Sequence, residues 1–340
     1  MNENNRQYVL VKRPETDVTD DIFDYREGAI PDPGEGEVLL KTLYLSFDPT
    51  QRGWLNDVPS YIPPVQIGEP MRAGGIGQVV QSNNPDFAVG DIVQGTIAWQ
   101  DYTAVKPGGA MPLTKLSRDY PLTHNMSIFG VTGLTGYFGL LEIGQPKEGD
   151  TVVVSGAAGA TGSVAGQIAK IKGCRVIGIA GGPDKCNWLT SKANFDAAID
   201  YKNDDVDAKL KELCPNGINV YFDNVGGEIL DAALLNLADG ARIVVCGGIS
   251  SGYHSWGTDH PPKNYMNLIL HSARMEGFLV LTYAAKFPQA IGDLAKWVQD
   301  GKIHFEEHIV EGLENAPATL RGLFEGKNLG KLILHVADPE

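Results

Sequence analysis

Two patterns of hydrophobic and polar positions follow each other along the chain. From Tyr8 to about Asn125, short segments alternate between apolar and polar residues and are separated by turn residues. Such alternation predicts strands with one buried face, here over Glu37–Leu43, Gly75–Gln81, Asp91–Ala98 and Asp101–Val105. We therefore expect a β-rich front part in a barrel-like or sandwich arrangement, with no helix longer than two turns.

From Ser127 the pattern changes to apolar runs that alternate with amphipathic stretches. A helix is predicted first, over Phe129–Ile143. Six strands are predicted at Thr151–Val154, Arg175–Ala180, Ala197–Ile199, Asn219–Asp223, Arg242–Val245 and Arg274–Val280. Further helices are predicted at Ser163–Lys172, Val206–Leu213, Glu228–Leu237 and Pro288–Gln299. This alternation indicates an α/β fold with a Rossmann-type, doubly wound parallel sheet.

The last part of the chain is β-like again. The segment from Glu307 to His335 contains a predicted helix at Ala316–Phe324 and a final strand at Lys331–Val336. Because 340 residues are more than one hydrophobic core usually organises, we expect two domains. Residues 1–126 and 302–340 would form a β-rich catalytic domain, and residues 127–301 a nucleotide-binding domain.

Charge and composition narrow the functions that such a fold could serve. The chain has 28 Lys and Arg against 42 Asp and Glu, a net charge of −14, which disfavours nucleic acid and anionic membranes as partners. It has no apolar run of about 18 residues, and its polar start does not resemble an export signal. The four cysteines stand singly and without metal-binding spacing, so we expect reduced thiols in a cytoplasmic protein.

A glycine-rich turn gives the strongest local signal. The apolar run Thr151–Val154 leads into Ser-Gly-Ala-Ala-Gly-Ala-Thr-Gly at positions 155–162, and a helical stretch comes next. Between a buried strand and a helix, such a turn lets the backbone approach a pyrophosphate, which the helix N-terminus stabilises. The spacing is G-x-x-G-x-x-G, so a merely tight turn is the alternative interpretation.

The end of the strand Arg175–Ala180 distinguishes between the two dinucleotides. A carboxylate there would bind the ribose 2′-OH of NAD, whereas a cation would bind the 2′-phosphate of NADP. The strand is followed by Gly-Gly-Pro-Asp-Lys at positions 181–185. Asp184 could indicate NAD, but it precedes a helical run, where Asp is a favoured N-cap, while Lys185 can point toward the phosphate. NADPH is therefore favoured, with a solvated surface charge as the alternative for Lys185.

Several segments give the whole chain a resemblance to the zinc-free branch of the medium-chain dehydrogenase/reductase superfamily. They are Leu45–Gly53, Gly130–Leu140, Ala157–Gly162, Tyr221–Gly227, Met275–Phe278 and Asn328–Lys331. Within this branch the chain is most similar to the prostaglandin and leukotriene reductases, the alkenal double-bond reductases and the curcumin reductases. The resemblance implies a GroES-like catalytic domain and NADPH-dependent reduction of the C=C bond of α,β-unsaturated ketones and aldehydes, by hydride transfer to the β-carbon.

Zinc-dependent relatives of this branch have metal ligands that the sequence lacks. They place a Cys in the loop that corresponds to Ser46–Arg52, a Gly-His-Glu just before the segment Gly74–Val80, and a structural lobe with four Cys. Here the tetrapeptide Glu-Pro-Met-Arg at positions 69–72 contains no His-Glu pair. We therefore expect an enzyme that works without a metal.

The resemblance also implies which residues bind the cofactor. Those at the pyrophosphate would be Ala158, Gly159, Ala160, Thr161 and Gly162, and those at the 2′-phosphate Lys185 and Tyr201. Those elsewhere along the cofactor would be Thr132, Asn224, Cys246, Ile249, Ser250, Phe278, Leu279, Val280 and Asn328. For Asn224 the alternative is a strand-end turn residue, and for Phe278 a core aromatic.

The predicted catalytic residue is Tyr253, because a phenol can donate a hydrogen bond to a developing enolate oxygen. Members of the group carry a Tyr shortly after a Cys-Gly-x-Ile-Ser turn, which here is Cys246–Ser250. This chain has one residue more than members that read Ser-x-Tyr, so packing or substrate contact is the alternative for Tyr253. Tyr61 and Trp99 are predicted as an apolar wall for the substrate.

Two other functions stay open at this point. The chain could be an NADPH-dependent quinone reductase with the same cofactor site, or a non-catalytic NADPH-binding protein. The strand Arg274–Val280 could pair across a two-fold axis, as it does in relatives, so we expect a homodimer.

Overall fold

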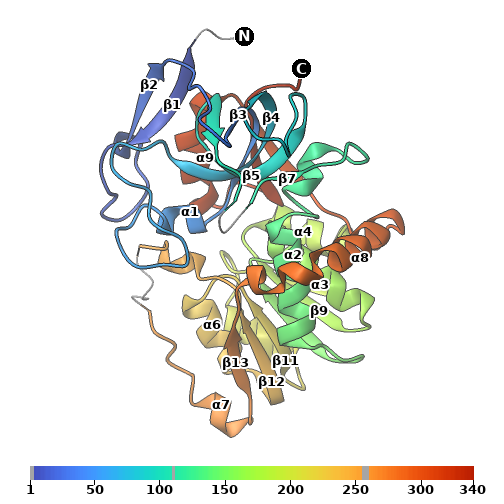
Figure 1. Cartoon of the computed structure of the whole chain (residues 1–340). Helices are drawn as coiled ribbons and strands as arrows, with labels where there is room; N and C mark the ends of the chain where they lie inside the picture. Colours follow the sequence, from blue (N-terminus) through green and yellow to red (C-terminus); the bar gives the residue numbers. More distant parts are fainter. Residues whose placement is uncertain (1–3, 109–111, 255–259) are drawn as a thin grey trace.

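The computed structural model describes residues 4–108, 112–254 and 260–340. Figure 1 shows two parts, one above the other: a β part that holds the N-terminal strands and the end of the chain, and an α/β part below it. The β part comprises the strands β1–β7, β14 and β15 with their connections. The α/β part comprises the parallel sheet and the helices that cover it.

The α/β part is built on a six-stranded sheet in the order β10-β9-β8-β11-β12-β13. Its strands are β8 (Thr151–Ser155), β9 (Arg175–Ala180), β10 (Ala197–Asp200), β11 (Ile218–Asp223), β12 (Leu237–Val245) and β13 (Arg274–Gly277). All neighbouring strands are parallel, which confirms the predicted α/β class. The chain runs outward from β8 to β10 and then returns to β11 on the other side of β8, so the carboxyl ends of β8 and β11 form the topological switch point where such sheets bind ligands.

Both faces of this sheet are covered by helices, which explains the continuous apolar runs in its strands. On β8, Val152 and Val154 pack into a core with helices on one face, whereas Val153 packs into a second core on the other. The first core involves α2 (Val131–Phe138), α3 (Ala160–Ile171), α4 (Pro183–Ser191) and α8 (Phe287–Gln299). The second involves α5 (Val206–Leu213) and α6 (Gly227–Leu234).

The β part contains a seven-stranded sheet in the order β14-β15-β3-β4-β5-β7, with β6 paired to β3. Its strands are β3 (Val38–Phe47), β4 (Arg72–Ser82), β5 (Ile92–Ala98), β6 (Tyr102–Val105), β7 (Thr114–Lys115), β14 (Glu307–Glu311) and β15 (Lys331–His335). A separate antiparallel pair is formed by β1 (Asn5–Leu10) and β2 (Phe23–Gly28). The tail joins the sheet because β15 runs antiparallel to β3, with Leu332 opposite Phe47.

The remaining elements are short. The α-helices are α1 (Thr50–Gly53), α7 (Asn267–Leu270) and α9 (Ala316–Phe324). The 3-10 helices are η1 (Asp20–Ile22), η2 (Leu122–Asn125), η4 (Ile249–Ser251), η5 (Val280–Lys286) and η6 (Leu313–Asn315). In the described residues before Ser127 the longest α-helix is α1, in agreement with the predicted β-rich front.

Two elements differ from the expectation at places that matter for the site. The predicted helix Phe129–Ile143 is α2 up to Phe138 and then a π-helical turn, η3 (Gly139–Gly144). At Gly139 an added Cβ would lie 2.5 Å from the ring of Phe278, so glycine lets that ring pack against the helix. The predicted strand Arg274–Val280 ends at Gly277, because Val280 begins the 3-10 helix η5.

Candidate active site

The predicted glycine turn lies between β8 and α3, with Gly159 as the N-cap of the helix. Gly156 has a φ of 58°, and a Cβ at Gly162 would lie 2.4 Å from the Gly156 carbonyl oxygen. Glycine is therefore required at both positions. No side chain of the described residues caps α3, so the N–H groups of its first turn are available to an anion. The turn fits the pyrophosphate of a dinucleotide.

The chain's tail closes over this turn from the β part. Gly330 forms an isolated parallel bridge with Gly159, and its N–H donates to the Ala158 carbonyl oxygen at 2.9 Å. Asn328 is held beside it, because its Nδ2 donates to the Gly330 carbonyl oxygen at 2.8 Å. The structure thus brings the predicted residue of the tail next to the predicted pyrophosphate turn.

The switch point is organised by a hydrogen-bond network between the ends of β8 and β11. Asn224 donates from its backbone N–H to Ser155 Oγ at 2.9 Å and from Nδ2 to the Ser155 carbonyl oxygen at 2.7 Å. Ser155 Oγ in turn donates to Asp223 Oδ1 at 2.9 Å. Burial raises the pKa of Asp223, although the Gly226 and Val225 N–H groups and Ser155 counteract this effect. Asn224 therefore ties the two strand ends together at the place where the cofactor is expected.

A cluster of cations lies at the end of β9. Lys185, near the start of α4, donates from Nζ to the Gly326 carbonyl oxygen at 2.7 Å. A Cβ at Gly181 would meet the side chains of Tyr201 and Lys202 at 2.8 and 2.9 Å, so both residues lie over the strand end. Burial and the nearby ammonium group of Lys202 lower the pKa of Lys185, which a bound phosphate would relieve. The cluster contains both predicted 2′-phosphate residues.

Two acidic residues lie near this cluster, in α4 and at the end of β10, and neither stands at the end of β9 itself. Gly182 is the N-cap of α4, with a φ of 95°, so the expectation that Asp184 caps the helix is wrong and Asp184 lies in its first turn. Asp200, at the end of β10, accepts hydrogen bonds from the Gly182 N–H at 2.7 Å and the Lys202 N–H at 3.1 Å. These N–H groups, together with Asn203, lower the pKa of Asp200.

The turn after β12 brings four further predicted residues to the switch point. The N–H groups of Cys246, Ile249 and Ser250 donate to the carbonyl oxygens of Asp223, Asn224 and Val225, respectively. The hydroxyl of Tyr253 folds back and accepts a hydrogen bond from the Gly248 N–H at 3.1 Å. Burial raises the pKa of Tyr253 to about 12 and that of Cys246 to about 12. Both side chains are therefore neutral at neutral pH.

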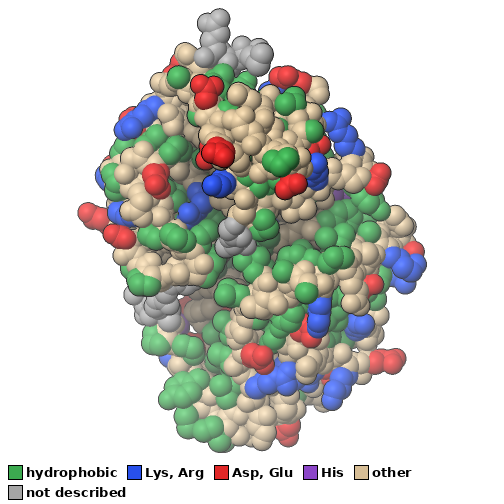
Figure 2. Space-filling model, viewed as in Figure 1, with side chains coloured by type: hydrophobic (Ala, Val, Ile, Leu, Met, Phe, Trp, Pro, Cys, Tyr) green, Lys and Arg blue, Asp and Glu red, His purple; other side chains and the backbone are tan. Residues whose placement is uncertain are grey.

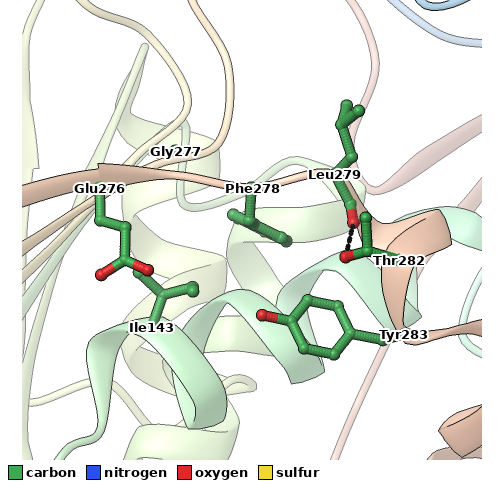
Figure 3. Close-up of a pocket in the computed structure, with 7 residues that line it drawn as sticks. All are labelled: Ile143, Glu276, Gly277, Phe278, Leu279, Thr282 and Tyr283. Atoms are coloured by element: carbon green, nitrogen blue, oxygen red, sulfur yellow. Dashed lines mark hydrogen bonds between the residues drawn. The ribbon is translucent and has the colours of Figure 1, made fainter.

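Phe278 follows β13 and packs on the π-helical turn. It also lines an open hollow of about 470 Å³, whose residues are drawn in Figure 3. Ile143, Leu279 and Tyr283 also line this hollow, and Thr282 Oγ1 donates to the Leu279 carbonyl oxygen at 2.7 Å. Phe278 lies next to Phe222 of β11 at Gly139, which agrees with its interpretation as a core aromatic, whereas its contact with the nicotinamide stays a prediction. Leu279 is exposed, and Val280 begins η5 behind it.

Thr132 lies in the first turn of α2, where its Oγ1 donates to the Ser127 carbonyl oxygen at 3.2 Å. The same helix crosses α3 closely, because a Cβ at Gly136 would lie 2.9 Å from the Thr161 carbonyl oxygen. The helix that carries Thr132 is thus packed directly on the helix whose N-terminus forms the pyrophosphate turn.

The two residues predicted to form the substrate wall lie in different environments. Trp99 is fully buried in the core of the β part, where its ring packs between Phe23 and Phe47 at centroid distances of 5.0 and 5.2 Å. The prediction for Trp99 is therefore wrong, since a side chain at the centre of a sheet core cannot contact a substrate. Tyr61 is 44% exposed, and its hydroxyl accepts a hydrogen bond from Trp54 Nε1 at 3.3 Å.

Two lysines near the site were not predicted. Lys202 follows Tyr201 directly, and its adjacency to a predicted phosphate residue was the available signal. Lys331 is buried, and its Nζ donates to the Phe47 carbonyl oxygen at 2.9 Å and to Asp48 Oδ1 at 2.5 Å. It ties the tail to the loop that holds the metal-ligand position in zinc-dependent relatives, and only the tertiary structure reveals this pairing.

Among the described residues, no group of three or more His, Cys, Asp or Glu side chains could hold a metal ion. In the same part of the chain, every helix is too short or too polar to cross a membrane.

Known protein families match both parts of the chain. A family model described as the N-terminal domain of oxidoreductase matches residues 6–113, and one described as zinc-binding dehydrogenase matches residues 160–296. The chain is 44% identical to the NADPH-dependent curcumin reductase of Escherichia coli (strain K12), over 98% of each chain. It is 40% identical to the 2-alkenal reductase (NADP(+)-dependent) of Nicotiana tabacum, over 89% of this chain and 88% of the relative.

Among solved structures, the chain is similar to CurA from Vibrio vulnificus in complex with NADPH. The TM-score is 0.91 with 42% identity, over 98% of this chain and 100% of that one. A quinone oxidoreductase of Pseudomonas syringae pv. Tomato DC3000 has a TM-score of 0.76 at 21% identity, over 97% of this chain and 99% of that one, which shows a shared fold only.

Proposed function

The chain belongs to the medium-chain dehydrogenase/reductase superfamily, in the group of the curcumin, 2-alkenal and prostaglandin reductases, and we propose on this premise that it reduces the C=C bond of α,β-unsaturated ketones and aldehydes with NADPH. The observation that carries the proposal is similarity over nearly the whole chain to reductases of this kind, combined with a switch point that fits their cofactor. NADPH supplies the hydride for the β-carbon when it is bound.

The residues of this chain orient the cofactor and exclude the alternative dinucleotide. The open N-terminus of α3 favours a pyrophosphate, and Lys185 and Lys202 favour a 2′-phosphate over a hydroxyl. Asn224 and the turn after β12 would contact the cofactor between its pyrophosphate and its 2′-phosphate. Thr132 belongs to α2, and Phe278 packs at Gly139 directly after that helix. We place the nicotinamide beside these two residues.

Tyr253 is our candidate for the group that stabilises the enolate oxygen. Its hydroxyl oxygen accepts a hydrogen bond from the Gly248 N–H, which leaves its own proton able to donate to a substrate carbonyl oxygen. Because burial raises the pKa of Tyr253 to about 12, the phenol keeps that proton over the physiological range. A neutral, pre-positioned donor of this kind stabilises negative charge as it develops.

We place the substrate wall of the β part at Tyr61. Trp54, which donates a hydrogen bond to the Tyr61 hydroxyl, replaces Trp99 as the second aromatic residue of this wall. Arg72 lies over the Trp54 ring at 5.2 Å from its centroid, which fixes the indole in place. An aromatic surface of this kind suits a hydrophobic enone.

The experiment that tests the function is the rate of NADPH oxidation over a panel of 2-alkenals, cyclic and aryl enones, and quinones. We expect reduction of alkenals or enones at their C=C bond, identified from the saturated product, and slower turnover of quinones. Quinones as the only substrates would replace the proposal by quinone reduction. NADPH binding with no turnover of any compound would support a non-catalytic protein.

We further propose that the protein works without a metal and in the cytoplasm. Ser46 and Glu69–Arg72 supply none of the Cys or His ligands that zinc-dependent relatives use at these positions. All four cysteines are free thiols, which supports a reducing compartment.

A homodimer is the remaining proposal about partners. The strand β13 stands at the end of its sheet, and Figure 2 shows hydrophobic side chains gathered over α7 at the bottom of the molecule. Met266, Ile269 and Leu270 are 53–74% exposed, which favours an apolar contact with a second copy. Light scattering should give the mass of a dimer for the wild type and of a monomer for Leu270→Glu. The control Leu235→Glu, an exposed leucine after α6, should stay dimeric.

A further inference from the structure

A side chain of the β part contacts the turn that carries Tyr253. Asn56 follows α1, and its Nδ2 donates to the Tyr253 backbone carbonyl oxygen at 2.9 Å. The two residues belong to different parts of the molecule and are separated by 197 positions in the sequence. The hydrogen bond therefore spans the junction between the β part and the α/β part.

The orientation of the Asn56 amide is fixed from behind. Arg52 is 1% exposed, and its Nη1 donates to Asn56 Oδ1 at 2.6 Å. Arg52 is itself held because Nε and Nη2 donate to the Thr16 carbonyl oxygen at 3.0 and 2.6 Å. Since a guanidinium can only donate, Asn56 must present its oxygen to Arg52 and its NH₂ group to Tyr253.

The backbone that receives this hydrogen bond is in an unfavourable conformation. Gly252 and Tyr253 have φ values of 62° and 54°, so two consecutive residues are left-handed. This conformation is unfavourable for a residue with a side chain, and it persists where surrounding contacts enforce it. With this backbone conformation, the Tyr253 side chain folds back so that its hydroxyl accepts a hydrogen bond from the Gly248 N–H. An external contact to the carbonyl group of the strained residue thus bears directly on where the phenol lies.

We propose that Asn56 is a positioning residue, which holds Tyr253 in its left-handed conformation from across the junction and thereby places the phenol over the switch point. The proposal rests on the proposed function for its effect on catalysis, but not for the contact itself. Asn56 does not touch the reacting atoms, and it acts only through Tyr253. The contact between the β part and the α/β part and the placement of the phenol then depend on the same hydrogen bond.

The test is Asn56→Asp, which keeps an oxygen for Arg52 and replaces the NH₂ group by an oxygen that repels the Tyr253 carbonyl. The matched control is Asn84→Asp, because Asn84 Nδ2 donates to the Gly36 carbonyl oxygen at 3.0 Å and joins two loops within the β part only. Steady-state kinetics with a 2-alkenal should show a roughly tenfold lower kcat for Asn56→Asp, while NADPH affinity changes less than about twofold. The control should retain the wild-type kcat.

A double-mutant cycle with Tyr253→Phe separates positioning from a general structural effect. If Asn56 acts through the hydroxyl, Asn56→Asp lowers kcat in the wild type but not in the Tyr253→Phe background. Multiplicative losses in kcat would overturn the proposal. Hydrogen exchange gives a readout that needs no turnover: the peptide covering residues 248–254 should exchange faster in Asn56→Asp than in Asn84→Asp. Equal exchange would also overturn it, whereas faster exchange in a protein that reduces no enone would refute the proposed function alone.

Discussion

Replacing Lys185 by Ala should weaken NADPH binding and leave NADH binding nearly unchanged. Lys185 is partly buried near the first turn of α4 and lies close enough to Lys202 for the two ammonium groups to repel each other. Its Nζ donates to a neutral acceptor, the Gly326 carbonyl oxygen, which does not balance the charge. A 2′-phosphate would supply the missing negative charge.

The size of the effect depends on this environment. A hydrogen bond between an ammonium and a phosphate group contributes about 1.5–3 kcal/mol. Since about 1.4 kcal/mol corresponds to a factor of ten, the Kd for NADPH should rise roughly ten- to hundredfold. NADH has no phosphate at this position. Its binding should therefore weaken only as far as the loss of the hydrogen bond from Lys185 to the Gly326 carbonyl oxygen disturbs the site. The ratio of the Kd for NADH to the Kd for NADPH should therefore fall by nearly the same ten- to hundredfold factor.

The assay is a fluorescence titration of each variant with NADPH and with NADH at two salt concentrations. The control is Lys192→Ala, an exposed lysine at the opposite end of the same helix, which should bind both cofactors as the wild type does. Added salt should weaken NADPH binding less in Lys185→Ala than in the wild type, because one charge pair is gone. Equal losses for both cofactors, or a similar loss in Lys192→Ala, would refute this reasoning.

The site and its surroundings lead to four further predictions. Tyr253→Phe should lower kcat for a medium-length 2-alkenal by about 10- to 10³-fold at nearly unchanged NADPH affinity, and a wild-type kcat would exclude the hydroxyl as donor. Exhaustive chelation should leave activity intact, whereas stoichiometric zinc whose removal abolishes activity would contradict the metal-free proposal. Trp99→Ala should lower the free energy of unfolding by about 3–5 kcal/mol through a core cavity, without raising the KM for enones; an unchanged stability with a raised KM would restore its place in a substrate wall. Because burial raises the pKa of Tyr253 from its ordinary value of 10.0 to about 12, the wild type should lose stability relative to Tyr253→Phe as the pH rises from about 10 toward 12; urea unfolding of both proteins across this range should show the difference, and parallel profiles would argue against the burial.

The parallel sheet could be predicted well because its signals are local. The strand β9 and the helix α5 have the predicted bounds, since a run of buried apolar residues or an amphipathic period identifies each without reference to the rest of the chain. The glycine turn could be predicted for the same reason, because the positive φ at Gly156 and the close backbone contact at Gly162 restrict the residue type directly.

Predictions that depended on which face a side chain occupies were less successful. Trp99 follows the end of β5, where the sequence gives no sign that its ring turns into the core between Phe23 and Phe47. The strand expected to end at Val280 stops at Gly277, and Phe278 then packs onto Gly139, a residue far away in the sequence. Lys331 and Asn56 were missed because their partners, Asp48 and Tyr253, are brought to them only by tertiary structure.

The additional residue before Tyr253 illustrates how backbone geometry can absorb a change in sequence length. An extra residue in an extended segment would move the phenol along the chain and away from the switch point. Here the turn η4 is followed by two left-handed residues, and the hydroxyl returns to within 3.1 Å of the Gly248 N–H. Glycine suits the position before Tyr253, since the φ of 62° at Gly252 would strain a residue with a side chain. The position of the phenol thus depends on this left-handed pair and on the amide of Asn56 that contacts it, rather than on its distance along the sequence from the cysteine turn.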